Sequence, residues 1–392
     1  MEQGSILISN KNVAVIGGGP AGCICAKILS DAGINTTLFD KGDLLRTLLP
    51  TGGGRCNLAN AIFDFKELTQ NYPRGNKFLY SVFSQFGTKE TLEFFESVNV
   101  KTYTQEDNRI FPISNSSADV RKKILNSLKC KFIKENVQNI IPLSSGFEII
   151  TSKSRYYFDK VVIAIGGHAD YNIFENLNIN IIPPTQSLVG LITKENFSSI
   201  SGVSIKDIKS VIDKNELCGD IIFTHKGISG PLIYRISSIY ARKKFPYIIK
   251  LKLTPDFDLQ NALNSNPHKE IKNLISNFIP KSLSEYILND LNIDIHTPCC
   301  KINGQMRNLI YKNLISFEIN VSGKVPDGEV VTCGGVDLKE INPQTLELKK
   351  YKGIYFCGEI LDIDGFCGGF NLQNCWSTGY VAANAILKEI IC

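Results

Sequence analysis

One stretch near the start of the chain restricts the possible folds more than any other. Residues 13–40 read VAVIGGGPAGCICAKILSDAGINTTLFD. The apolar run at 13–16 is typical of a buried parallel strand, and glycines spaced as G-x-G-x-x-G follow it at once. A helical stretch follows, and residues 36–39 form a second strand. This order predicts a Rossmann-like α/β fold that binds a dinucleotide.

Each residue of this motif has an expected role. Gly17 permits the tight turn, Gly19 lets the backbone approach a pyrophosphate, and Gly22 lets helix and strand pack closely. The helix that begins at Pro20 and Ala21 offers N–H donors to the phosphates. Asp40, followed by Lys41, lies where an acid accepts the adenosine ribose hydroxyls. An acid there disfavours a 2′-phosphate, so we expect FAD or NAD, and the motif's early position favours FAD.

A second signature lies at the other end of the chain. Residues 351–384 contain a strand that leads into Gly358 and Glu359, and Asp364 follows. A helix then opens with Gly368, Gly369, Phe370 and Asn371. In two-part flavin folds such an acid binds the ribityl chain, and the helix N-terminus points at the flavin edge where negative charge develops on reduction. We therefore predict that this segment returns to the first domain.

Three further stretches fit the same cofactor. Residues 51–57 read TGGGRCN, and we expect Gly53 and Gly54 to let the backbone approach the cofactor. Arg55 would balance phosphate or reduced-flavin charge, with Cys56 and Asn57 near the ring. We also expect the chain to pass the dinucleotide at Gly166 and Gly167, and at Val137, which would pair with the adenine.

Composition narrows the class of protein. A chain of 392 residues predicts two or three domains, and a net charge of +5 argues against a nucleic-acid partner. The start of the chain does not resemble a signal peptide, and there is no apolar run long enough for a membrane span, so we expect a cytoplasmic protein without membrane contact. Four dispersed histidines and the cysteine spacing predict no metal site.

These residues resemble a known family over nearly the whole chain: the bacterial BaiN/RdsA-type NAD(P)/FAD-dependent oxidoreductases, also called aminoacetone-oxidase-family flavoproteins. The resemblance rests on residues 13–40, on TGGGRCNLAN, on FTHKGISGP at 223–231 and on GEILDIDGFCGGFNLQ at 358–373. It implies an α/β, Rossmann-like FAD-binding domain in two pieces, 1–184 and 341–392. It further implies an inserted β-barrel-like domain, 185–255 and 316–340, carrying a small helical domain, 256–315. The segment after Gly167 is shorter than in the family.

Catalytic residues are harder to predict. His225, beside glycine turns, is a candidate proton donor or a structural residue of the turn. Arg109 is a candidate anion-binding residue or a solvent-facing strand residue. A redox role for Cys56 is the weaker alternative, because no resolving cysteine is evident.

The leading functional hypothesis is a FAD-dependent oxidoreductase. NADH or NADPH, as a transient co-substrate, would reduce flavin N5, and the hydride would pass to a small or medium organic acceptor such as an activated C=C bond. Alternatives are a flavin-dependent amine oxidase that uses oxygen and a non-catalytic or redox-sensing flavoprotein. Flavin-dependent RNA modification is disfavoured by the charge balance. The expected partner is a small-molecule substrate, and the oligomeric state is not predicted.

Overall fold

The computed structural model describes residues 11–326, 328 and 331–391, and it divides the chain into two compact units. Unit 1 comprises Met1–Thr185 and Val331–Cys392, and unit 2 comprises Gln186–Val330. The start of the chain, for which we expect no signal peptide, falls at residues 1–10 outside the described residues.

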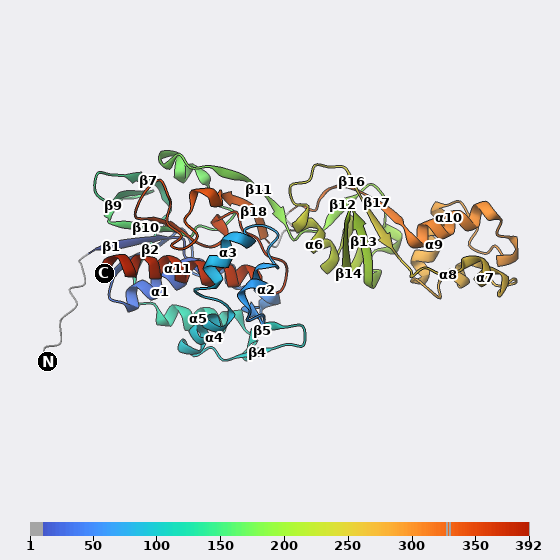
Figure 1. Ribbon diagram of the computed structural model, residues 1–392, viewed down its shortest axis with the longest axis horizontal. Coiled ribbons are helices and arrows are strands. Elements are labelled where there is room, and N and C mark those ends of the chain that lie inside the picture. The colour runs from blue at the N-terminus through green and yellow to red at the C-terminus, as the bar shows by residue number, and fades with distance from the viewer. Residues whose placement is uncertain (1–10, 327, 329–330, 392) are drawn as a thin grey trace. The chain divides into compact units, whose positions relative to one another are not determined.

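Unit 1 is built on a five-stranded parallel sheet with the order β19-β10-β1-β2-β6 (Figure 1). Its strands are β1 (Asn12–Ile16), β2 (Asn35–Asp40), β6 (Lys131–Lys134), β10 (Lys160–Ile163) and β19 (Ile354–Phe356). The central strands β1 and β10 consist almost wholly of buried residues, as expected for a parallel sheet covered on both faces. The last strand, β19, comes from the C-terminal segment.

Two helices far apart in the sequence pack against each other in unit 1: α1 (Pro20–Asp31) and α11 (Phe370–Ile391). A Cβ on Gly379 of α11 would collide with the carbonyl of Ala21 and with Ile24, so glycine permits the close approach. The other helices of this unit are α2 (Phe65–Thr69), α3 (Asn76–Phe83), α4 (Thr88–Ser97) and α5 (Ser117–Ser127).

Two small antiparallel sheets complete this part of the chain. One consists of β3 (Ala59–Asn60), β4 (Thr102–Thr104) and β5 (Arg109–Pro112), and the other of β7 (Val137–Pro142), β8 (Phe147–Thr151) and β9 (Arg155–Phe158).

The two consecutive prolines do not interrupt the strand structure. Pro183 and Pro184, which end the predicted first piece of the FAD-binding domain, lie inside β11 (Ile181–Ser187), whose one partner strand among the described residues is β18 (Val331–Val336). A strand with a single neighbour leaves half of its N–H groups unused, and proline is tolerated there.

Unit 2 contains a closed six-stranded barrel with the order β12-β15-β14-β13-β16-β17 (Figure 1). Its strands are β12 (Leu191–Thr193), β13 (Ser204–Ile212), β14 (Asn215–Thr224), β15 (Gly227–Ser229), β16 (Tyr247–Lys252) and β17 (Phe317–Lys324). Buried and exposed residues alternate along β16, so Tyr247, Ile249 and Leu251 fill the interior.

Helices complete unit 2: α6 (Pro231–Ile239), α7 (Leu259–Asn264), α8 (Ile271–Ile275), α9 (Lys281–Asp290) and α10 (Gly304–Ile315). The predicted fold class, a two-piece Rossmann-like domain with an inserted barrel and a helical segment, is confirmed. Among the described residues, no helix has the length and apolar character needed to cross a membrane.

Candidate functional site

The turn between β1 and α1 is closely packed on one side and open on the other. Gly17 has φ +106°, and a Cβ there would collide with the carbonyl of Ala164, just after β10. A Cβ on Gly22 would collide with the carbonyl of Gly17. A Cβ on Gly19 would meet only Thr47 Oγ1, at 3.9 Å. This asymmetry suits a turn that presents its backbone to a phosphate.

The N-terminus of α1 has donors to offer. No side chain caps this helix, whose N-cap residue is Gly19. Pro20 has no N–H, so the first helical donors belong to Ala21 and Gly22. An uncapped helix N-terminus binds anions through these groups and through the helix dipole.

Asp40 lies at the end of β2, beside the glycine turn. Its carboxylate accepts hydrogen bonds from Gly18 N at 2.6 Å and from Gly42 N at 2.7 Å. These bonds hold the carboxylate in place and leave further lone pairs for a ribose. Lys41 is exposed next to it.

The TGGGRCN loop has open space on one side. Gly53 and Gly54 adopt φ +67° and +83°, and a Cβ on either would meet nothing within 4 Å. Arg55 extends away to lie over the Phe111 ring, with its guanidinium carbon 4.3 Å from the centroid. Its Nε donates to Gly52 O at 3.4 Å, so in this structure Arg55 anchors the loop to β5.

Cys56 and Asn57 have structural environments. Cys56 is fully buried, and burial raises the pKa of its thiol to about 12, which disfavours a redox thiolate. With its amide oriented to satisfy both ends, Asn57 donates to Ala59 O at 3.0 Å and Ile110 O at 3.2 Å. The Asn57 oxygen accepts from Gly369 N at 3.0 Å, so this side chain joins the TGGGRCN loop to the start of α11.

Further contacts hold the start of α11 in position. Asn60 Nδ2 donates to Gly368 O at 3.1 Å, and Tyr72 Oη donates to Phe370 O at 2.6 Å. A Cβ on Gly369, which has φ +95°, would collide with the Ala59 carbonyl. Among the described residues, the buried Oδ1 of Asn60 has no hydrogen-bond partner, so an acceptor remains available here.

The loop that precedes α11 is closed by a side chain from the first turn of that helix. Asn371 Oδ1 accepts from Gly365 N at 2.8 Å, and its Nδ2 donates to Gly365 O at 2.9 Å. Upstream, Gly358 N donates to Thr378 Oγ1 at 2.9 Å, which ties the end of β19 to α11.

The two predicted acids differ in their surroundings. Asp364 is fully buried and forms a two-pronged ion pair with Arg74. Glu359 is half-buried, and removal from water together with the Asp364 charge raises the pKa of its carboxyl to about 7. The charge of Asp364 is therefore paired with Arg74, whereas Glu359 titrates near neutral pH.

The remaining predicted cofactor residues lie elsewhere in unit 1. A Cβ on Gly166 would meet nothing within 4 Å, whereas one on Gly167 would lie 2.6 Å from Thr332 Cβ. Val137 begins β7 and is paired with Thr151 in a separate sheet. It takes no part in the contacts described above between the TGGGRCN segment and the start of α11.

Of the two catalytic candidates, Arg109 pairs through Nη2 with Asp107 Oδ2 at 2.6 Å, and both side chains are substantially exposed. This ion pair favours the alternative that Arg109 is a solvent-facing strand residue over the alternative that it binds an anion. His225 is exposed in the turn between β14 and β15, within unit 2.

Sequence reasoning missed three residues that shape this region: Asn60, Tyr72 and Arg74. Asn60 falls just after TGGGRCN, within the block that signals the family, so that block was the available signal. Tyr72 and Arg74 lie in an unremarkable stretch, NYPRGNKF, and contact partners about 300 residues away.

These residues fit FAD. The open faces of Gly19, Gly53 and Gly54, the uncapped α1 N-terminus and the unpaired Asn60 Oδ1 together offer space, anion-binding donors and an acceptor. In the described part of the chain, no group of three or more His, Cys, Asp or Glu residues is placed to hold a metal ion.

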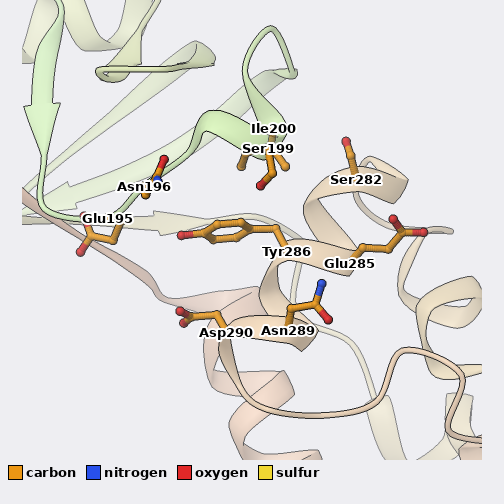
Figure 2. A pocket seen from close by; sticks show the side chains of 9 residues that line it. All are labelled: Glu195, Asn196, Ser199, Ile200, Ser282, Glu285, Tyr286, Asn289 and Asp290. Carbon is orange, nitrogen blue, oxygen red and sulfur yellow. The ribbon is translucent and has the colours of Figure 1, made fainter.

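A pocket of about 480 Å³ lies within unit 2, and Figure 2 shows that none of the predicted site residues lines it. Its lining includes the acids Glu195, Glu285 and Asp290, with Tyr286 pointing toward Glu195. Burial, Asp290 and Glu195 raise the pKa of Tyr286 to about 12. An acidic lining is unsuited to a cofactor diphosphate.

Comparison with known proteins decides the family. The family model described as "HI0933-like protein Rossmann domain" matches residues 11–385. The chain belongs to this family. The HI0933-like proteins related to it include named oxidoreductases, and the chain is accordingly a member of a family of FAD-binding oxidoreductases.

Two relatives match this HI0933-like chain over almost its whole length. An Escherichia coli K12 protein named ribosomal RNA dihydrouridine synthase is 26% identical over 95% of this chain and 97% of its own. A Clostridium scindens protein named 3-dehydro-bile acid delta(4,6)-reductase is 28% identical over 96% of this chain and 99% of its own.

Solved structures agree on the fold. The 3-ketosteroid delta1-dehydrogenase of Sterolibacterium denitrificans superposes with a TM-score of 0.50 at 11% identity, covering 97% of this chain and 100% of that one. The Mycobacterium smegmatis Sdh1 complex gives 0.51 at 12% identity, covering 97% of this chain and 68% of that one.

The expectation that nucleic acid plays no part is wrong. It is overturned by the relatives from E. coli and Haemophilus influenzae, both named ribosomal RNA dihydrouridine synthase. The expectation rested on the net charge of the whole chain, and such a sum does not show how charge is distributed between two units.

Proposed function

We propose that unit 1 binds one FAD between its two sequence pieces. The proposed contacts are four parts of the set predicted from the sequence: the 17–22 turn, Asp40, the 53–57 loop and the 358–371 segment. The observation that carries the proposal is the Asn60 Nδ2–Gly368 O hydrogen bond of 3.1 Å, which joins the segment after the open TGGGRCN loop to the start of α11. We likewise propose that the two sequence pieces form the FAD-binding domain and that the segment between them forms the inserted domain.

When bound, FAD supplies hydride chemistry, accepting a hydride from NADH or NADPH and donating one to an acceptor. The chain supplies the setting. Asn57 and Asn60 hold the N-terminus of α11, whose dipole favours negative charge beside Gly368 and Gly369. Arg74 pairs with Asp364, which reduces the repulsion between this acid and that charge. Glu359, with its pKa near 7, is the group able to take up or release a proton.

The acceptor we propose is a C=C bond conjugated to a carbonyl group. Dihydrouridine differs from uridine by two hydrogens across such a bond, and a 3-oxo steroid with a delta(4,6) system contains the same group. The names of both relatives therefore describe the same type of reaction, reduction of a C=C bond conjugated to a carbonyl group. Hydride would add to the β-carbon and a proton to the α-carbon, so NAD(P)H and one proton are consumed per bond reduced.

Anaerobic reduction followed by acceptor addition tests this proposal. NADH or NADPH should bleach the flavin absorbance, and a conjugated steroid enone or uridine-containing RNA should restore it with formation of the saturated product. A flavin that neither nicotinamide reduces, or that only oxygen reoxidises, would contradict the proposal and favour the oxidase alternative.

A further inference from the structure

The excess positive charge of this protein is greatest in one segment. Residues 186–255, which contain five of the six barrel strands, carry 11 Lys or Arg and 5 Asp or Glu. The rest of the chain carries 32 basic and 33 acidic residues. The barrel segment therefore has a net charge of +6, whereas the remainder has −1. Such a local excess is the usual electrostatic feature of nucleic-acid binding.

Strand register places several of these lysines together. On the outer face of the barrel, Lys209 of β13 lies directly opposite Lys252 of β16, and Lys250 is opposite the next outward residue, Val211. Like charges directly opposite each other on paired strands are destabilising. Glu318 pairs with Lys250 at 3.2 Å and Asp256 with Lys252 at 2.7 Å, which relieves part of this repulsion.

The same strand pair continues into a second basic group at the β13–β14 hairpin. Lys214 is exposed in this hairpin, and the neighbouring Asp213 pairs with Lys243 at 2.5 Å. Lys244 is exposed beside Lys243. Among the described residues, Lys209, Lys214 and Lys244 have no acidic partner within 4.0 Å, so their charges are available to an anion.

An aromatic side chain accompanies this basic group. Phe245 is 38% exposed, and its ring stacks on that of Tyr247 with centroids 5.4 Å apart and planes 18° apart. Lys243 Nζ lies 5.7 Å from the Tyr247 centroid. A flat ring held by a second ring and bordered by lysines is a suitable platform for a nucleobase.

We infer that this β13/β16 surface, comprising Lys209, Lys214, Lys243, Lys244, Phe245 and Lys250, binds the backbone and a base of single-stranded RNA. The lysines are spread along one strand pair, which suits a run of phosphates, and the exposed ring adds stacking. The inference deepens the proposed function by naming RNA as the carrier of the reacting pyrimidine, but the surface itself lies wholly in unit 2.

A binding titration tests this inference: the full chain is added to a short fluorescein-labelled single-stranded RNA, and binding is measured by fluorescence polarisation. The variant K209Q/K214Q/K244Q should bind at least about tenfold more weakly, and the slope of log K against log salt should fall by about 2, since each lost phosphate contact removes about 0.7. Phe245→Ala should weaken binding by about fivefold or more at every salt concentration.

The chain offers matched controls in its helical segment. K281Q/K301Q/K312Q removes the same charge from exposed positions of residues 256–315, where six basic and six acidic residues cancel. Phe278 is 41% exposed and stacks on Phe257 with centroids 4.3 Å apart, so Phe278→Ala matches Phe245→Ala. Both controls should retain the affinity of the unmodified protein.

Equal loss in the control and barrel variants, or no loss in either, would overturn the inference. So would retention by anionic phosphatidylserine vesicles without RNA binding, which would assign the surface to a membrane. The polarisation measurement does not involve the flavin. Reduction of a small enone without RNA binding would therefore refute this inference alone, whereas RNA binding without C=C reduction would refute the proposed function alone.

Discussion

At the scale of single residues, the same type of ion pair has different importance in two places. Arg74 and Asp364 are almost completely removed from water, with side-chain exposures of 12% and 0%, whereas Arg109 and Asp107 have 41% and 53%. Exposed pairs contribute little because water and salt screen them, but a buried charge that loses its partner is costly.

Arg74→Gln should therefore lower the free energy of unfolding by about 3–5 kcal/mol, because it removes a charged partner from the fully buried Asp364 carboxylate. Arg109→Gln should lower it by at most about 1 kcal/mol. Urea denaturation of both variants measures the difference. Equal losses would mean that the Arg74–Asp364 pair is not the buried contact described above, and R74Q/D364N should recover part of the stability.

Glu359 gives unit 1 a specific pH dependence. Because burial and Asp364 raise its pKa from 4.5 to about 7, the folded protein holds this proton more tightly than the unfolded chain. The protonated Glu359 therefore contributes to the free energy of unfolding. This contribution is fully present below pH 4.5 and is lost as the pH rises through about 7. Glu359→Gln should remove up to about 3 kcal/mol of this variation. Denaturation of the cofactor-free protein across this window measures it, and identical profiles would refute the assignment.

At the scale of elements, the start of α11 depends on contacts with the TGGGRCN segment. Gly369 has φ +95° and no room for a Cβ against the Ala59 carbonyl. Gly369→Ala should displace the helix start and reduce FAD content by about tenfold or more. It disturbs the hydrogen bond that Gly369 N donates to Asn57 and the one that Asn60 donates to Gly368 O, each worth about 1 kcal/mol. Flavin released on denaturation measures the content.

Gly202→Ala is the matched control. Gly202 has φ +89°, so alanine is strained there as well, but a Cβ would meet nothing within 4 Å and the residue lies in unit 2. The control should keep its full flavin content. Equal flavin loss in both variants would show that backbone strain, and not the α11 contact, causes the effect.

The elements themselves were largely predictable, because their signals are local. The strand at 13–16, the glycine turn and the strand ending in Asp40 appear where periodicity and spacing placed them. The place of Pro183 and Pro184 inside a strand was not predictable, because it depends on the pairing of β11 with a single neighbour among the described residues. Arg74 and Asp364 are 290 positions apart, and no local pattern links them.

At the scale of the whole molecule, the incorrect expectation that nucleic acid plays no part came from averaging the charge over the whole chain. A net charge of +5 combines a barrel segment of +6 with a remainder of −1, so the sum concealed the basic segment to which we assign RNA binding. Fold class was predicted well because two separated signatures, at residues 13–40 and 358–371, describe one domain.

Titration of the cofactor-free chain with FAD, monitored by flavin fluorescence, tests whether both sequence pieces form one FAD site. We expect saturation at one FAD per chain, with binding weakened by about tenfold or more in both Asp40→Ala and Gly369→Ala, because each removes contacts from a different piece of the domain. Binding that depends on residues of only one piece, or no saturable binding of FAD by the folded chain, would contradict this expectation.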